Sequence, residues 1–291
     1  MEKKAGWQAA RRAIQAQPQL TVLAVCRRVG MTPQNYYARR RGRQRRDVDL
    51  KLVLDLVRAQ RREQPRLGGR KLYYLIGPEL KKARVKLGRD RFFAELKKAG
   101  MLVERRPSEW PKTTRFDPAL PVFKNLIKRR CVRRRNEVWV ADITYIRTDE
   151  GFLYLELMLD LYSRKIVGFH LGATLEAKIV LQAFEMALKS LRPKEKPIHH
   201  SDRGCQYASH AFVERVKQAG LRLSMTERNH SAENSVAERL NGILKQEYWL
   251  DVGFTTHRQA RQACTRAIAL YNCRRPHTFL DLKTPEQVHQ A

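Results

Sequence analysis

Three acidic residues of the chain stand at positions where a carboxylate could do chemistry. Asp142 lies inside the apolar, β-branched run VWVADITYI, and Asp202 directly follows the short apolar run PIHHS. Glu238 follows Asp202 after 35 intervening residues, in a segment with helical spacing. A carboxylate inside an apolar strand is costly to bury unless a partner compensates its charge; an arginine would be a structural partner and a divalent metal a functional one. We favour the metal, because carboxylates from separate elements suit two Mg²⁺ or Mn²⁺ ions, and such a pair can activate and stabilise the oxygens of a phosphodiester. The expected catalytic and metal-binding residues are Asp142, Asp202 and Glu238.

The segment around Glu238 is expected to present its polar residues on one helical face. At 100° per residue, Lys245 lies about 20° and Asn234 about 40° from Glu238, with Asn241 nearby, whereas the apolar residues lie on the opposite side. A random amphipathic helix would also have a polar face. Lys245 is two turns from Glu238, too far for a local ion pair, so we expect it to hold a phosphate rather than to be a solvated side chain. For His199 and His200, packing or orienting roles are favoured over metal binding.

The net charge of +30 points to a polyanionic partner, which we take to be DNA. Residues 1–135 hold 38 Lys and Arg against 11 Asp and Glu, whereas residues 136–291 hold 21 against 18. A basic surface that only aids solubility is the less favoured alternative, because self-repulsion on this scale destabilises a domain that has no anion to neutralise it. The five cysteines form no CxxC pair and suit a reducing cytoplasm. The sequence shows neither a secretory signal nor an apolar run long enough to span a membrane.

The first half of the chain is expected to be helical. Residues 1–46 resemble a helix-turn-helix, with a turn at Gly30, a helix that starts at Thr32-Pro33 and an arginine-rich second helix, although an ordinary helical hairpin would look similar. Residues 47–104 predict a second helical DNA-binding unit, interrupted at Gln64-Pro65 and closed by Gly100. Residues 105–136 are rich in Pro and Arg and are expected to form a linker that contacts phosphate.

Residues 137–291 change to a strand period. Three apolar runs separated by short turns predict antiparallel strands, followed by a helix (176–191), a strand (197–200), a helix (210–219), a strand (221–224) and two helices (233–248 and 257–271). This order is that of the ribonuclease-H-like fold. The predicted fold class is therefore an α/β core with a mixed five-stranded sheet, preceded by all-α, helix-turn-helix-like units.

Four segments together resemble a known family: WVADITYI, HSDRGCQYAS, ENSVAERLNGILKQEY and YNCRRPHTFLDLKTPEQ. They are similar to the motifs of insertion-sequence transposases of the IS-three family, second open reading frame (OrfB), which have a retroviral-integrase-type core. The 35-residue spacing between Asp202 and Glu238 matches the DD(35)E pattern of that family, and Lys245 occupies its usual basic position. Cys205 stands where serine is more common, and Glu233 where aspartate is common. Residues 1–135 contain no histidine, so no zinc site of the integrase type is expected.

The resemblance implies a transposase that uses two Mg²⁺ or Mn²⁺ ions per active site to cut at element ends and to transfer the 3′-hydroxyl to target DNA. The implied partners are terminal inverted repeats, target DNA, further copies of the chain and an upstream-frame (OrfA) protein or fusion. A ribonuclease-H-like nuclease or resolvase, and a DNA-binding regulator with an inactive core, remain as alternatives. The expected DNA contacts are Lys245, Asn234, Asn241, Arg239, Arg275, Arg39, Arg40, Arg41, Arg43, Arg70, Lys71, Arg133, Arg134 and Arg135.

Overall fold

The structure is a computed structural model that describes residues 2–17, 19–104, 120–227 and 234–291. The chain divides into two compact units. The first contains Met1–Ala59 and Ile76–Arg91, and the second contains Gln60–Leu75 and Phe92–Ala291. Among the described residues, no helix is both long and apolar enough to cross a membrane.

The first unit begins with three helices, α1 (Glu2–Ala16), α2 (Val22–Arg28) and α3 (Pro33–Glu63). Thr21 caps α2 by accepting a hydrogen bond from the Ala24 amide, and the Thr32 hydroxyl accepts one from the Asn35 amide at the start of α3. Gly30 makes the turn between them with a φ of 65°, which suits glycine. The expected helix-turn-helix order is therefore present, and it packs on a small apolar core that contains Val25, Cys26 and Tyr36.

Helix α3 is longer than expected and runs through the boundary placed between residues 46 and 47. The segment contains no proline after Pro33, and its single Gly42 is tolerated inside a helix at a cost of about 1 kcal/mol. The Arg43–Asp47 pair adds local support at helical spacing. Helices α4 (Gly69–Lys82) and α5 (Arg89–Lys98) follow where they were expected. The expected 47–104 segment is divided between the two compact units, whose boundaries fall within α3, α4 and α5.

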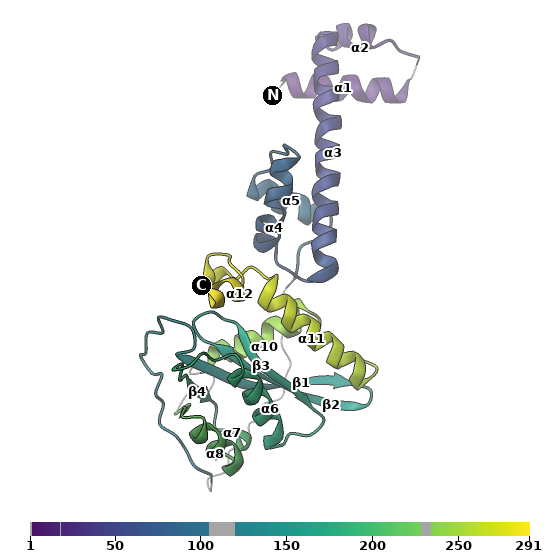
Figure 1. Cartoon of the computed structure of the whole chain (residues 1–291). Helices are drawn as coiled ribbons and strands as arrows, with labels where there is room; N and C mark the ends of the chain where they lie inside the picture. The colour runs from purple at the N-terminus through teal and green to yellow at the C-terminus, as the bar shows by residue number, and fades with distance from the viewer. Residues whose placement is uncertain (1, 18, 105–119, 228–233) are drawn as a thin grey trace. The chain divides into compact units, whose positions relative to one another are not determined.

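The second unit is built on a five-stranded mixed sheet in the order β3-β2-β1-β4-β5 (Figure 1). Strands β1 (Val138–Thr148), β2 (Gly151–Asp160) and β3 (Ile166–Gly172) are antiparallel, as the short connecting turns predicted. Strands β4 (Ile198–Ser201) and β5 (Arg222–Met225) run parallel to β1. This is the ribonuclease-H-like arrangement, and the prediction of the fold class is confirmed.

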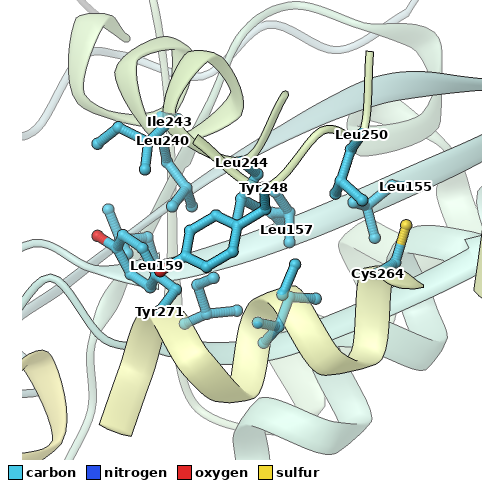
Figure 2. Packing of buried hydrophobic residues seen from close by; sticks show 14 of the residues in the cluster. Leu155, Leu157, Leu159, Leu240, Ile243, Leu244, Tyr248, Leu250, Cys264 and Tyr271 are labelled. Atoms are coloured by element: carbon cyan, nitrogen blue, oxygen red, sulfur yellow. The ribbon is translucent and has the colours of Figure 1, made fainter. Parts of the chain in front are cut away.

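Helices cover both faces of this sheet, so β1 and β2 are largely buried on both sides. Helices α6 (Ala177–Leu188), α7 (Cys205–Ala208) and α8 (His210–Gln218) pack on the face that carries Trp139 and Met158. Gly168 of β3 allows α6 to lie close, since an added Cβ would overlap the Ala183 carbonyl oxygen. Helices α10 (Ser235–Glu247) and α11 (His257–Cys273) cover the other face, where side chains of β2 meet Leu244, Tyr248 and Tyr271 (Figure 2).

Some elements lie outside the predictions. The short helix α7, the 3₁₀ turn at Thr278–Leu280 and the final helix α12 (Pro285–Gln290) were not predicted; each is too short to show a clear period. Residues 105–119 of the predicted linker, and Glu233, lie outside the described residues.

Candidate active site

Asp142 is positioned by the alternation of β1. Val138 and Val140 on the same face of the strand belong to the core beneath α10 and α11, so the Asp142 side chain points toward α10 as well. The Asn241 side-chain amide on α10 donates a hydrogen bond of 2.7 Å to Asp142 Oδ2. Burial raises the pKa of Asp142 to about 7, and the nearby negative charges of Asp202 and Glu238 add to this effect. Asp142 keeps some exposure because it lines a cavity that opens to solvent.

Asp202 comes directly after β4, at the carboxyl end of a strand that is parallel to β1. Its Oδ1 accepts a 2.9 Å hydrogen bond from the Gly204 amide. Gly204 allows this close approach, since an added Cβ would lie 3.0 Å from that same oxygen and would require it to shift slightly. The Arg203 guanidinium binds the carbonyl oxygens of Thr226 and Glu227, both at 2.7 Å, and so ties the loop after β4 to the loop after β5.

Glu238 lies in the first turn of α10, where the helix dipole favours a negative charge. Its side chain is exposed, and its charge is near enough to raise the pKa of Asp142. The start of α10 is attached to β1 by Asn234, whose amide donates a 3.1 Å hydrogen bond to the Ala141 carbonyl oxygen. The fold therefore brings all three predicted carboxylates into one electrostatic neighbourhood.

The polar face of α10 points toward β1. Asn234, Asn241 and Lys245 are only 3%, 8% and 7% exposed. The two asparagines bind β1 instead of facing a groove for DNA, so their predicted role as DNA contacts does not fit their burial. Lys245 Nζ lies 5.8 Å from the centre of the Tyr145 ring. Burial lowers the pKa of Lys245 to about 8, although Asp142 and Asp251 partly oppose the shift. Lys245 is not a solvated surface lysine.

A cavity of about 450 Å³ lies beside the two aspartates. Both Asp142 and Asp202 line it, whereas Glu238 does not belong to its wall. The remaining wall is partly aromatic and partly polar: Ile143, Tyr145, Tyr154, Leu175, Gly204, Cys205, Gln206 and Tyr207. The cavity combines two carboxylates with a mixed aromatic and polar wall.

Glu156 is a further acidic residue at this site that sequence reasoning missed. It lies on β2, is completely buried, and accepts a 2.7 Å hydrogen bond from the hydroxyl of Tyr207, which lines the cavity. Burial raises the pKa of Glu156 well above its ordinary value, and the charges of Asp142 and Asp202 add to the rise. The available signal was the same as for Asp142, an acid inside an apolar strand, here FLYLELMLDL. Glu156 holds Tyr207 in place behind the loop of Asp202.

The oxygen donors of the site fit a hard divalent cation. Burial and mutual repulsion of the carboxylates would both be relieved by a cation. The side-chain oxygens of Asn234 and Asn241 are buried, and among the described residues they find no hydrogen-bond donor. Carboxylate and amide oxygens are the ligands that Mg²⁺ and Mn²⁺ accept. In the described part of the chain, no three His, Cys, Asp or Glu side chains are close enough together to form a complete metal-binding group.

The neighbouring histidines have packing roles. His199 is buried between the rings of Phe184, Tyr207 and Phe212. Burial lowers the pKa of His199 to about 3, so the ring is neutral, and within the described residues its nitrogens form no hydrogen bond. His200 Nδ1 lies 2.9 Å from the Ser224 hydroxyl on β5. These positions agree with the packing interpretation favoured from the sequence.

Two of the predicted DNA contacts are parts of a buried ion-pair network. The guanidinium of Arg275 is 3% exposed and makes two hydrogen bonds, of 2.7 and 2.8 Å, with the carboxylate of Glu247 at the end of α10. Lys71 Nζ lies 2.9 Å from the same carboxylate. The DNA-contact role predicted for Arg275 and Lys71 does not fit their positions, because both side chains are held inside the protein on the carboxylate of Glu247.

The other predicted contacts are more accessible. Arg70, Arg133, Arg134 and Arg239 are exposed, and Arg135 is half-buried. In the first unit, Arg40 and Arg41 are exposed, and Arg39 and Arg43 are half-buried on α3. Arg43 packs over the Trp7 ring at 5.8 Å.

Comparison with known proteins finds similarity over most of the chain. The integrase core domain family matches residues 132–231, and a second family with the same description matches residues 219–285. The uncharacterized 31 kDa protein of insertion element IS600 from Shigella sonnei is 32% identical over 91% of this chain and 99% of its own length. Transposase InsF for insertion sequence IS3A from Escherichia coli is 34% identical over 58% of this chain, which spans 59% of that protein. The HTLV-2 integrase catalytic core, solved in complex with magnesium, is 22% identical with a TM-score of 0.43 over 54% of this chain and 97% of that chain.

Proposed function

Because this chain belongs to the insertion-sequence transposases of the IS-three family, second open reading frame, with a core of the integrase type, we propose that it cuts DNA at the ends of an insertion element and joins the freed 3′-hydroxyl to target DNA. The observation that carries the proposal is the concentration of negative charge at one cavity. Asp142 and Asp202 line the cavity, and Glu238 adds its charge from the start of α10. A divalent cation bound there would relieve the repulsion that raises the pKa of Asp142.

Asp142, Asp202 and Glu238 would hold two Mg²⁺ or Mn²⁺ ions. When bound, the two ions supply activation of the attacking oxygen and stabilisation of the leaving oxygen. The protein's own groups set the geometry: Asn241 fixes one oxygen of Asp142, and the Gly204 amide fixes one oxygen of Asp202. The rings of Tyr145 and Tyr154 form part of the cavity wall beside Asp142. Lys245, beside Tyr145 and within the field of Asp142, would neutralise a phosphate next to the scissile bond.

We assign DNA binding mainly to the basic first half of the chain. Residues 1–135 carry a net charge of +27, against +3 for residues 136–291. In the first unit, the second helix of the helix-turn-helix carries Arg39, Arg40, Arg41 and Arg43. Helices of this kind place basic side chains against the DNA backbone and groove. Two element ends must be joined in one reaction, so the acting species would be a multimer, with or without an upstream-frame protein.

A cleavage and joining assay tests the proposal directly. The full chain is incubated with labelled duplexes that carry the ends of its element, a target plasmid and Mg²⁺, and the strands are separated on a denaturing gel. We expect nicked strands and strands joined to the plasmid, and we expect none with EDTA or with the matched variants Asp202→Asn and Glu238→Gln. Nicking without any joined product would favour a ribonuclease-H-like nuclease. DNA binding without any metal-dependent product, with or without the upstream-frame protein, would favour a regulator with an inactive core.

A further inference from the structure

A second, larger cavity lies at the amino ends of β1, β4 and β5, at the opposite end of these strands from the carboxylates. Its volume is about 830 Å³, and none of its lining residues is shared with the cavity of Asp142 and Asp202. The wall comes from the segments before β1 and β4, from the turn after β2, from the first residue of β5, and from α12 with the residues on either side of it. Residues far apart in the sequence therefore meet at the amino ends of three parallel strands. We call this cavity the basic groove.

The basic groove is lined mainly by positive side chains. The segment before β1 contributes Arg130, Arg133, Arg134 and Arg135, and the loop before β4 contributes Arg192, Lys194 and Lys196. Arg222 at the start of β5 and Lys283 before α12 complete the set. Eight of these nine cations are exposed, and Arg135 is half-buried. Arginine suits phosphate in particular, because its planar guanidinium binds two phosphate oxygens at once.

The acidic residues of the groove are already paired inside its wall. Its two acidic side chains are Glu137 and Glu195. Glu137 Oε1 lies 3.3 Å from Arg134 Nε, and Glu195 Oε1 lies 3.4 Å from Arg135 Nε. Among the charged side chains of the groove, nine cations stand against two carboxylates, an excess of seven. This excess is the electrostatic signature of a site for a polyanion.

The floor of the groove is held in place by buried hydrogen bonds. The Asn136 amide nitrogen of the backbone donates to Asp160 Oδ2 at 2.7 Å, and the Asn136 side chain donates to Glu195 Oε2 at 2.9 Å. Arg135 Nη1 donates to the His289 carbonyl oxygen on α12 at 2.6 Å. Because the segment before β1 is fixed to the last residue of β2 and to α12, the groove is formed before any ligand arrives. Less ordering is then required on binding.

The groove and the catalytic cavity are at opposite ends of the same strand. The groove reaches the amino end of β4 through Lys196, two residues before Ile198, whereas Asp202 follows the carboxyl end. With about 3.3 Å per residue, the four steps from Ile198 to Asp202 span about 13 Å. A phosphate held in the groove is therefore not the phosphate that reacts at the carboxylates.

We propose that the basic groove binds the phosphodiester backbone of a DNA segment distinct from the segment in the catalytic cavity. The proposal rests on the proposed function in one respect, because strand joining requires the chain to hold more DNA than the bond being cut. The contacts are with the backbone, so the groove is indifferent to base sequence. Its contribution to binding falls as salt rises, because phosphate contacts release counterions.

A charge-matched pair of double variants of the full chain tests the groove. Arg192→Ser with Arg222→Ser removes two exposed groove cations from two different segments. Arg258→Ser with Arg266→Ser removes two exposed cations from α11, outside the groove. Binding of a labelled duplex of about 60 base pairs and unrelated sequence is measured by fluorescence anisotropy, in EDTA, across a salt series. Thermal melting confirms that all the variants are folded.

We expect the groove variant to bind about tenfold more weakly near 0.15 M salt, and its salt slope to decrease by close to two. The control pair should change affinity by less than about twofold. Equal effects of the two pairs, or an unchanged salt slope in the groove variant, would overturn the proposal. Because binding is measured without metal, this result does not depend on catalysis, whereas the proposed function is tested by cleavage alone. A folded groove variant that binds as the wild type does, in a chain that still nicks and joins, refutes the groove and leaves the proposed function intact.

Discussion

Glu247, which ends helix α10, and Asp142, which is hydrogen-bonded to Asn241 of the same helix, are carboxylates in opposite environments. Glu247, at the carboxyl end of the helix, is held by Arg275 and Lys71; burial alone would raise the pKa of Glu247, but these two cations lower it to about 2. Asp142 faces the other half of the helix, where burial and two further carboxylates raise the pKa of Asp142 to about 7. The fold itself satisfies the first charge. It leaves the second charge uncompensated, and a buried group that is strained in this way is typical of a functional site.

The largest effect is expected when the uncompensated carboxylate is removed. Asp142→Asn keeps the shape and can still accept the hydrogen bond from Asn241, but it lacks the charge that would hold the metal ions. Cleavage in Mg²⁺ should decrease at least about 1,000-fold, or about 4 kcal/mol of transition-state stabilisation. Single-turnover rates on terminal DNA, with binding measured in parallel, give this number. If the variant retained more than a tenth of the wild-type rate, Asp142 would not be a catalytic ligand.

Removal of the compensated carboxylate should affect stability instead. Glu247→Gln leaves Arg275 buried without its anion, so we expect the free energy of unfolding to fall by about 3 kcal/mol. Glu79→Gln is the matched control, because Glu79 pairs with Lys82 in solvent and such a pair contributes at most about 1 kcal/mol. Denaturant titration of both variants measures the difference. Similar losses in the two variants would contradict the contrast drawn between the ends of α10.

The two carboxylates should also give pH dependences of opposite sign. The pKa of Asp142 is raised from 3.8 in the unfolded chain to about 7 in the folded protein. Ionisation of Asp142 therefore costs the folded protein free energy of unfolding: the full stability is present below about pH 4 and is lost as the pH rises through about 7. Glu247 has a lowered pKa, so its contribution is present above about 4.5 and is lost as the pH falls toward 2. In EDTA at pH 8, Asp142→Asn should therefore be more stable than the wild type, by about 2 kcal/mol.

Divalent metal should remove this difference, because Mg²⁺ or Mn²⁺ binds the ionised carboxylate and competes with its proton. The increase in Tm caused by Mn²⁺ should be larger at pH 8 than at pH 6 in the wild type, and small in Asp142→Asn at both. Melting curves recorded with and without metal at the two pH values make the comparison. A metal effect that is independent of pH would show that Asp142 is not among the ligands.

Lys245 is expected to give the smallest effect. Its side chain is buried beside Tyr145, so Lys245→Met, which keeps the bulk and removes the charge, is a cleaner test than alanine. We expect cleavage at limiting DNA to decrease about tenfold and the salt slope to decrease by about one phosphate contact. Lys245→Arg should keep much of the activity. Wild-type rates in Lys245→Met would make Lys245 a packing residue.

The order and type of most elements could be predicted from the sequence, because they depend on local periods. The alternating runs around Asp142 predicted antiparallel strands, and the helical spacing around Glu238 predicted α10. Two helices joined by a turn at Gly30 lie where the helix-turn-helix was predicted, whereas α3 runs through the predicted boundary at residue 46 because it contains no strong break there. Helix α7 was missed because four residues show no period.

The roles of individual charges depended on contacts that no local pattern contains. Lys71 and Glu247 are 176 positions apart and form one ion pair, so an apparently free lysine proved to be part of the core. The polar face of α10 was visible in the sequence, but its direction was not, because an amphipathic pattern does not indicate whether the polar side meets solvent or a buried strand. The role of Glu156 likewise follows only from the tertiary structure, which places the hydroxyl of Tyr207 within hydrogen-bond distance of its carboxylate.

By itself, the sequence determined that acidic side chains would stand in or directly after buried strands, and that the positive charge would be concentrated in the first half of the chain. The tertiary structure decided which of those charges are neutralised. Arg275 and Lys71 share the carboxylate of Glu247, while Asp142 faces Asp202 and Glu238. The physical reason is that residue types and their periods are local properties, whereas the pKa of a buried carboxylate is set by the solvent it loses and by the charges that distant segments bring to it.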